Sequence, residues 1–315
     1  MLSHVRRWIV APLATLLAAS FVLYTTVWLQ PGNPLTILLG TKASPAQYRY
    51  LAHKLGLDRP MLVRYWDWLT NAVHGNFGIS LVYKQSVASL IAPRLLTTLL
   101  LVAYAGVIIT VIGVTLGIIG GMSPRAAPYV AGLNGLGVAI PGFVAAEVLI
   151  AVFAVKLGWF PVLGTGQGLA GRLQHLTLPA FALAIASIAY VSQITRAAVS
   201  NEEQSSHVET ARGRGLAGPR ILRRHVLRNA AIPIMTVSAL TVASLLAGAI
   251  VVEYAFGLGG IGSLLVQSVS DKDSNVVLAI GLILVLVFVI TTTALDFLQY
   301  RLDPRLRLEV AASWH

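Results

Sequence analysis

The stretch that decides the fold is His207-Val-Glu-Thr-Ala-Arg-Gly-Arg-Gly-Leu216, continued by Ala217-Gly-Pro-Arg-Ile-Leu-Arg-Arg-His-Val-Leu-Arg-Asn229. This polar, arginine-rich island lies between two long apolar runs, and hydrocarbon cannot hold it, so it must lie in water on one side of a membrane. Gly213 and Gly215 can adopt the left-handed backbone that ends a helix, and Gly218-Pro219 is a typical helix start. The island is therefore predicted to form two short helices around a turn, a compact knob suited to a soluble partner.

The composition places the chain in a membrane. Of 315 residues, 56% are apolar and only 11% are charged, whereas soluble domains carry about 25% charged residues. The absence of cysteine excludes disulfides, thiolate metal sites and cysteine nucleophiles. The net charge of +11 comes mostly from arginines beside apolar segments, which is typical of cytoplasmic retention. No aromatic-basic platform accompanies this charge, so no nucleic-acid partner is expected.

Apolar runs predict an all-α protein with six transmembrane helices, since about 20 helical residues cross a bilayer core. Arg6 and Arg7 precede the first run, Arg125 follows the second, and the arginines of the island follow the fourth. These positions put both termini and the island on the inner face of a bacterial cytoplasmic membrane. The first run exceeds the apolar stretch of a signal peptide and is expected to be retained. The six runs are residues 8–29, 95–120, 130–156, 176–198, 231–252 and 276–300.

Between the first two spans lies a long outer loop that is predicted to be structured. Ser44-Pro45 is a helix start and Gly56 a stop, and an amphipathic helix rich in Trp and Tyr follows from Pro60 to His74. Its aromatic side chains suit the outer boundary of the membrane or packing on the spans. The expected organisation is an N-terminal region with the first span at 1–30, the outer loop at 31–94, a five-helix core at 95–305 that includes the loop 199–230, and a tail at 306–315.

Motifs for catalysis are missing from the sequence. It contains no G-x-x-x-x-G-K-[ST] phosphate loop, no H-E-x-x-H and no serine nucleophile elbow. The chain is therefore expected not to be an enzyme and to bind no cofactor or metal of its own. If ATP drives its function, ATP and Mg²⁺ are used by partner subunits.

An ordered set of segments resembles the permease subunits of ABC importers for dipeptides and oligopeptides. The resemblance covers nearly the whole chain and implies the type I permease fold. It also implies a second permease subunit, one or two ATPase subunits, and an extracytoplasmic binding protein that delivers peptide. The matching segments are Leu29-Gln-Pro-Gly-Asn-Pro34, Leu55-Gly-Leu-Asp-Arg-Pro60, Gly75-Asn-Phe-Gly-Ile-Ser80, Leu157-Gly-Trp-Phe-Pro161, Leu176-Thr-Leu-Pro-Ala180, Thr210-Ala-Arg-Gly-Arg-Gly-Leu216, Arg224-His-Val-Leu-Arg-Asn229 and Leu302-Asp-Pro-Arg305.

Within this resemblance, the island is similar to the EAA loop, whose coupling helix docks into a groove of an ATPase subunit. Small Ala211 and the glycines would permit close approach, and the flanking arginines would offer charge-assisted contacts. The alternative is an arginine cluster that only fixes topology and touches lipid phosphates. The chain departs from the family pattern at Arg228 and near Gly259, where a proline is usual. The expected coupling residues are Glu209, Thr210, Ala211, Arg212, Gly215 and Leu216.

Candidate residues for the translocation path are few. Glu147 falls near the middle of the third span, where it either lines the path or is a hydrogen-bonded structural glutamate. Pro141, followed by a glycine, can bend that span. Gln193 and Asn134 could offer polar contacts to cargo or hydrogen bonds between helices. Glu253 is expected at the outer mouth, in contact with the binding protein or the second permease.

Other function classes are less well supported. An ion-coupled secondary transporter would show internal repeats and several acidic residues within its spans, and the sequence shows neither. A membrane enzyme would need clustered His, Asp and Ser side chains. Within the importer class, a permease for a non-peptide solute, such as a nickel complex or haem, is the remaining alternative.

Overall fold

The computed structural model describes residues 9–29, 44–54 and 56–302, which form helices, turns and one isolated β-bridge between Ile79 and Ser86. Three segments named above lie outside the described residues. They are most of the Leu29–Pro34 motif, the Leu302–Arg305 signature beyond its first residue, and the tail 306–315. By its internal contacts the chain divides into two compact units, described separately below. The first comprises residues 1–97 and 259–290, and the second comprises 98–258 and 291–315.

The first unit is built around apolar helices that include the first predicted span. The two helices predicted for the outer loop are present: one ends before Gly56, which has a left-handed φ of 66°, and the other ends before Gly75. Its elements are α2 (Ala11–Leu29), α4 (Pro45–Lys54), α5 (Met61–Val73), the start of α6 (Val87–Ile108), α14 (Ile261–Ser270) and the greater part of α15 (Ser274–Leu302).

Aromatic side chains join α5 to α2. Tyr65 and Leu69 of α5 are buried against Tyr24 and Val27 of α2. The Tyr65 hydroxyl lies 2.9 Å from Ser20 Oγ, so its polar group has a partner inside the apolar contact. Of the two roles expected for the aromatic residues of this helix, packing against a span is the one that Tyr65 shows.

A buried carboxylate ties the loop before α6 to the start of α15. Asp273 is fully buried, and its Oδ2 accepts hydrogen bonds from Ser80 Oγ and from the Val82 backbone N–H, the latter at 3.3 Å. Asn275 Nδ2 donates to the Ile79 carbonyl at 2.8 Å. Because buried polar groups need partners, these bonds specify how the loop closes over the helix start.

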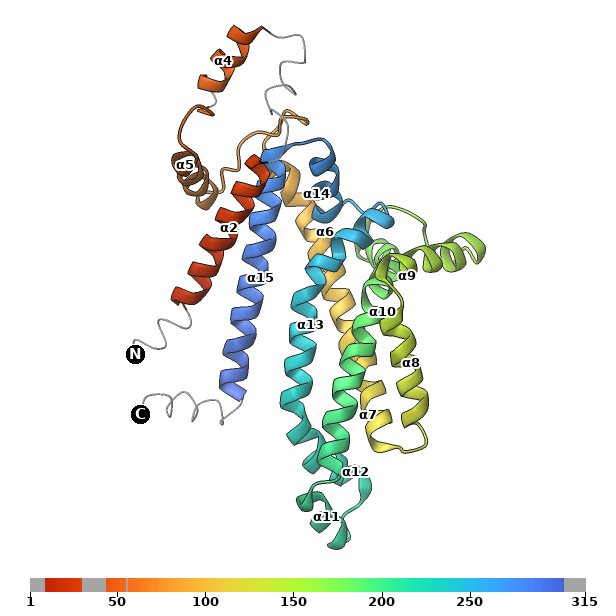
Figure 1. The fold of residues 1–315 in the computed structure, drawn as a ribbon. Helices are drawn as coiled ribbons and strands as arrows, with labels where there is room; N and C mark the ends of the chain where they lie inside the picture. Colours follow the sequence, from red (N-terminus) through yellow and green to blue (C-terminus); the bar gives the residue numbers. More distant parts are fainter. Residues whose placement is uncertain (1–8, 30–43, 55, 303–315) are drawn as a thin grey trace, which may run out of the picture. The chain divides into compact units, whose positions relative to one another are not determined.

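The second unit contains the helices that carry the predicted path and island (Figure 1). Three of its segments are π-helical turns, which occur mostly as single turns inside longer helices and frequently at functional sites. Besides the end of α6, its elements are η2 (Ile109–Gly113), α7 (Val114–Met122), α8 (Ala127–Ala139), α9 (Gly142–Leu149), η3 (Ile150–Lys156), α10 (Gly168–Glu203), α11 (Ser206–Gly213), α12 (Gly218–Ile221), η4 (Leu222–Val226) and α13 (Leu227–Ala255).

A stripe of glycines lets η2 and α7 pack directly on α10. A Cβ added at Gly121 would lie 2.8 Å from a neighbouring side-chain carbon of α10, and one at Gly117 would overlap α10 outright. This is the small-residue packing that brings membrane helices close together. Residue numbers rise together on both helices, so the two run parallel. The contacts pair Gly113 with Val191, Gly117 with Thr195 and Gly121 with Val199.

The parallel direction of α7 and α10 requires the intervening chain to return across the unit. α8 begins this return, because its Gly137 packs on Ala189, with an added Cβ 2.9 Å away, while its start lies beside the end of α7. The turn that contains Arg125 and the end of α10 therefore lie at the same end of the second unit (Figure 1). The segment after α7 therefore starts the return toward the end of the unit at which α10 begins.

The predicted third span, residues 130–156, contains a sharp bend. α8 ends at Ala139, Ile140 and Pro141 have extended backbones, and α9 starts at Gly142. The helical halves 127–139 and 142–156 differ in direction by 97°. Proline cannot continue the hydrogen-bond ladder and disfavours helical backbone in the residue before it, so the predicted bend at Pro141-Gly142 is confirmed.

Other spans differ from the prediction mainly at their ends. Together α6, η2 and α7 form a helix that starts at Val87, eight residues before the predicted start, because Pro93 lies in its second turn and interrupts little of the hydrogen bonding. α10 starts at Gly168 and α14 was not predicted. Among the described residues, five helices are long and apolar enough to cross a membrane, and six if the bent pair counts as one.

The glycine stripe generates a stability prediction. Gly117→Ala introduces a Cβ that overlaps Thr195, and overpacking of this kind costs about 1–3 kcal/mol. The variant should unfold at a clearly lower temperature in detergent. Gly132→Ala on α8 is the matched control, because a Cβ at this position has no neighbouring atom within 4 Å. Equal midpoints for the two variants would contradict the close contact.

The buried carboxylate generates a second prediction. Asp273→Ala leaves the Ser80 hydroxyl and the Val82 N–H without their acceptor, which costs about 1–3 kcal/mol when such groups stay buried. The loop should open locally, and trypsin should cleave after exposed Lys84 faster than in the parent chain. Asp271→Ala, at an exposed position two residues away, should leave the cleavage rate unchanged.

Candidate functional site

The predicted knob is present at the junction of α10 and α13 and consists of residues 206–226, that is α11, α12 and η4 (Figure 1). α11 ends at Gly213, and Gly215 has the left-handed φ of 74° that the turn requires. α12 begins at Gly218 with Pro219 in its first turn. Two short helices around a glycine turn are therefore confirmed, with Gly215 rather than Gly213 in the left-handed conformation.

The knob has an apolar core that is continuous with the long helices. Val208 and Val226 are fully buried, and Leu216 packs against the same cluster. Ala211 is only 4% exposed in this core. The expectation that Ala211 offers close approach to a partner is therefore wrong, since its small side chain lets α11 pack on its own chain. The buried members are Val199, Val208, Ala211, Ile221, Val226, Ala230 and Ile234.

Polar contacts fasten α11 to both long helices. Arg212 Nη2 lies 2.5 Å from Glu203 Oε1 at the end of α10. His207 Nε2 lies 3.5 Å from Glu202 Oε2, and the same oxygen accepts a hydrogen bond from Asn229 Nδ2 of α13 at 3.3 Å. Arg212 is thus engaged within the chain. Displacing α11 would strain contacts with α10 and α13 together.

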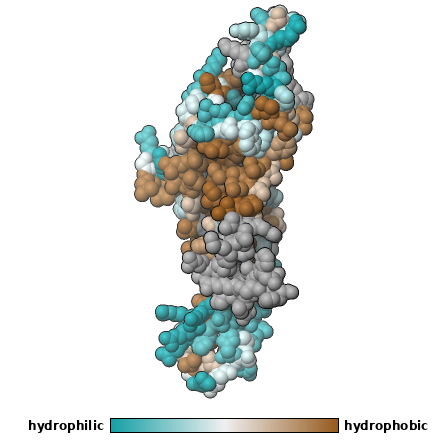
Figure 2. Space-filling view, turned by 90° about the vertical axis from the view of Figure 1, so that its left-hand side faces the viewer, coloured by the Kyte–Doolittle hydropathy of each residue, from teal (hydrophilic) through white to brown (hydrophobic). Residues whose placement is uncertain are grey.

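The outward face of α11 is small and polar. Glu209 and Thr210 are exposed, and so is Gly213, around whose missing Cβ there is nothing within 4 Å. Figure 2 shows hydrophilic side chains gathered over the knob at its lower end. A partner approaching α11 would therefore meet Glu209, Thr210 and Gly213, with Gly215 in the exposed turn beyond them.

Four arginines form a second exposed face on the same segment. Their spacing of three, four and eight residues places them on one side of the helical run from α12 to α13. They line a depression of about 580 Å³ together with Pro219, and none of them has an ion pair within the described part of the chain. This face offers concentrated positive charge to an acidic protein or to phosphates. The arginines are Arg220, Arg223, Arg224 and Arg228.

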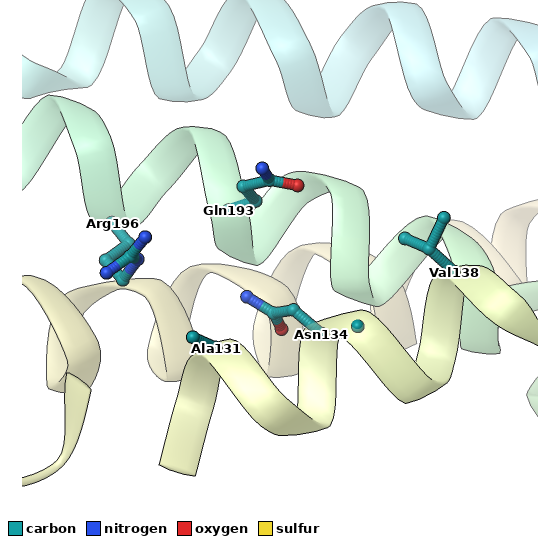
Figure 3. Close-up of a pocket in the computed structure, with 6 residues that line it drawn as sticks. Ala131, Asn134, Val138, Gln193 and Arg196 are labelled. Atoms are coloured by element: carbon teal, nitrogen blue, oxygen red, sulfur yellow. The ribbon is translucent and has the colours of Figure 1, made fainter. Parts of the chain in front are cut away.

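Two of the predicted path residues, Asn134 of α8 and Gln193 of α10, meet in one pocket of about 270 Å³ (Figure 3). Arg196, which the sequence analysis did not select, lines it as well. An arginine inside the apolar run 176–198 was the available signal, because such residues are costly in membrane spans. Three apolar residues of α8 complete the lining: Ala131, Gly135 and Val138.

The remaining predicted residues lie elsewhere in the second unit. Pro141 is at the bend, and Glu147 is exposed on α9 and does not line this pocket. Glu253 is fully buried near the end of α13 and accepts a hydrogen bond from Thr98 Oγ1 of α6. The prediction that Glu253 meets a partner at an outer mouth is therefore wrong, because its carboxylate faces its own helices.

Comparison with known proteins identifies the family. The sequence model described as "Binding-protein-dependent transport system inner membrane component" matches residues 113–308, and the N-terminal model of such membrane components matches residues 1–102. The chain belongs to this family of ABC importer permeases. It is accordingly a multi-pass protein of the bacterial inner membrane, as the sequence predicted.

Relatives resemble this permease over nearly its whole length. It is 33% identical to the oligopeptide transport system permease protein AppB of Bacillus subtilis (strain 168), covering 97% of this chain and 99% of AppB. It is also 33% identical to the glutathione transport system permease protein GsiC of Escherichia coli (strain K12), covering 98% and 99%.

Solved structures share the permease fold. A chain of the inward-facing MetNI methionine ABC transporter aligns with a TM-score of 0.57 at 18% identity, covering 68% of this chain and 96% of that chain. A chain of an amino acid ABC transporter aligns with a TM-score of 0.52 at 21% identity, covering 68% and 94%. The predicted all-α permease fold is thus confirmed.

The packing of the knob predicts which contacts keep this permease's α11 in place. Val208→Ala removes two fully buried methyl groups, at about 0.8 kcal/mol each. Amide exchange across residues 206–213 should accelerate roughly tenfold. Arg212→Ala breaks a half-exposed ion pair, worth at most about 1 kcal/mol, and should accelerate exchange less. The opposite ranking in hydrogen-exchange mass spectrometry would contradict the apolar anchoring.

Proposed function

We propose that this permease forms half of the translocation path of an ATP-driven importer for short peptides. The names of its relatives, an oligopeptide permease and a glutathione permease, support a peptide cargo. A second permease subunit would complete the path, and an extracytoplasmic binding protein would deliver the cargo. The chain itself is non-catalytic in this proposal: one or two ATPase subunits bind ATP and Mg²⁺ and perform the hydrolysis.

The observation that carries the coupling role is the combination of an open surface and a rigid base in α11. Glu209, Thr210 and Gly213 offer a small, polar docking face to an ATPase groove. Behind that face, Val208 and Ala211 are buried in a core shared with α10 and α13. A displacement of α11 would therefore be transmitted to α10 and α13, because no flexible loop separates α11 from them.

The energy of transport would enter through this docking face. A ligand shifts a conformational equilibrium only by as much as its affinity differs between the two states. The ATPases change their arrangement when they bind ATP, so their contacts with α11 would differ between inward-open and outward-open permease. Arg212 and Leu216 would act from within the chain by holding α11 in its orientation.

Orientation follows from the basic residues in this proposal. Arg125 and the arginines of the knob lie at the same end of the second unit, and such clusters stay on the cytoplasmic side. With the bent pair counted as one span, six crossings place both termini inside as well. The arginine face lined by Arg220 to Arg228 would then meet either an acidic rim of the ATPase or lipid phosphates.

A substitution at Gly213 tests the docking face without disturbing the fold. Gly213→Trp adds a large side chain where a Cβ meets nothing within 4 Å and the backbone is helical. Co-purification with the ATPase subunits and peptide uptake should both fall at least roughly tenfold, which is about 1.4 kcal/mol of docking energy. Gly213→Ala is the control and should retain both. Unchanged co-purification and uptake in the tryptophan variant would refute docking through α11.

A further inference from the structure

The pocket between α8 and α10 contains hydrogen-bond donors without acceptors. Asn134 is 6% exposed, and its Nδ2 is buried without a partner. The Nε of Arg196 is likewise buried without a partner. A buried polar group left unpaired costs about 1–3 kcal/mol, and more if it is charged. Two such donors in one pocket indicate that a ligand rich in acceptor atoms completes the site.

The pocket is kept open by small residues and by a fixed arginine. Ala131 and Gly135 are spaced by four on α8 and line the pocket on that side, and a Cβ at Gly135 would meet nothing within 4 Å. On the other side, the Arg196 stem is packed against Gly120, where an added Cβ would lie 3.0 Å from Arg196 Cδ. The volume of about 270 Å³ suits a carboxylate or phosphate group with its first attached atoms.

The charge of the lining selects the sign of the ligand. The pocket has one guanidinium and two carboxamides and no acidic residue, namely Arg196 with Asn134 and Gln193. Arg196 also lines a neighbouring pocket together with Glu203, whose carboxylate is paired with Arg212. Guanidinium and amide N–H groups bind oxyanions through short, charge-assisted hydrogen bonds.

The position of the pocket brings it near charged groups of lipid or cargo. Asn134 lies seven residues after the start of α8, and Arg196 lies seven residues before the end of α10. At 1.5 Å per residue, the pocket is about 10 Å from the end of the unit at which α8 starts and α10 runs into the knob. α10 has 36 residues and would span about 54 Å, so it extends well beyond a core about 30 Å thick.

From these observations we propose that the Asn134–Gln193–Arg196 pocket binds an oxyanion, with Arg196 and Asn134 as donors. Two sources share this chemistry: the terminal carboxylate of a peptide cargo and the phosphate of an anionic phospholipid. Pure interhelical bonding by Asn134 and Gln193 is disfavoured because Asn134 Nδ2 has no partner on α10. The assignment of the oxyanion to a peptide cargo rests on the proposed function, whereas the proposal that the pocket binds an oxyanion does not.

The test compares two glycines of α8 in the full chain, purified in detergent with the partner subunits it retains. Gly135→Val places methyl groups in the pocket. Gly132→Val is the control: a Cβ at either glycine has no neighbour within 4 Å, but Gly132 does not line the pocket. The probes are a dipeptide with a free carboxylate, the same dipeptide as its C-terminal amide, short-chain phosphatidic acid, and the neutral diacylglycerol. Thermal-shift titrations measure each apparent Kd.

One of the two anionic probes should raise the unfolding temperature of the parent chain and of Gly132→Val. Its apparent Kd should be at least roughly tenfold weaker for Gly135→Val and for Asn134→Leu, and its neutral counterpart should not bind. The responding probe identifies the source. The proposal is overturned if neither anion binds, if the neutral probe binds equally, or if Gly135→Val binds as well as Gly132→Val. Because no ATP or transport is involved, these outcomes are independent of docking through α11.

Discussion

The direct packing of α7 on α10 is the contact on which the rest of the second unit depends. Glycines at 113, 117 and 121 bring the helices so close that side chains of α10 occupy the space of the missing Cβ atoms. The paired positions show that the two helices run parallel, so the segment between them must return across the unit. The place of the α7–α8 turn beside the end of α10 follows from that requirement.

The knob combines an apolar inner face with a polar outer face. Its apolar residues, including Val208 and Ala211, face inward and extend the core of α10 and α13. Its small and charged residues, Thr210 and Glu209 among them, face outward. The EAA-like segment is thus partly a folding motif, and a substitution at Ala211 would act through packing before it acts on any partner.

Local signals in the sequence predicted the features that depend on local backbone chemistry. The glycine turn of the knob, the bend at Pro141 and both helices of the outer loop all rest on capping, left-handed or proline positions, and all are present. The sequence could not predict which side of each helix is buried in the protein, because in a membrane span lipid-facing and buried residues are equally apolar. Glu253 is therefore buried where exposure was expected, and Arg196 was missed although it shares a pocket with Asn134.

The sharp bend at Pro141 carries a consequence for solvation. The last turn of α8 ends with backbone carbonyl groups that no later residue of that helix can satisfy. Acyl chains offer no donors, so irregular backbone persists at membrane depth only beside water or covered by protein. If the bend lies within the hydrocarbon core, its surroundings must therefore be water-filled or covered by protein. Glu147, which is exposed six residues after Pro141, is a carboxylate for which the same requirement holds.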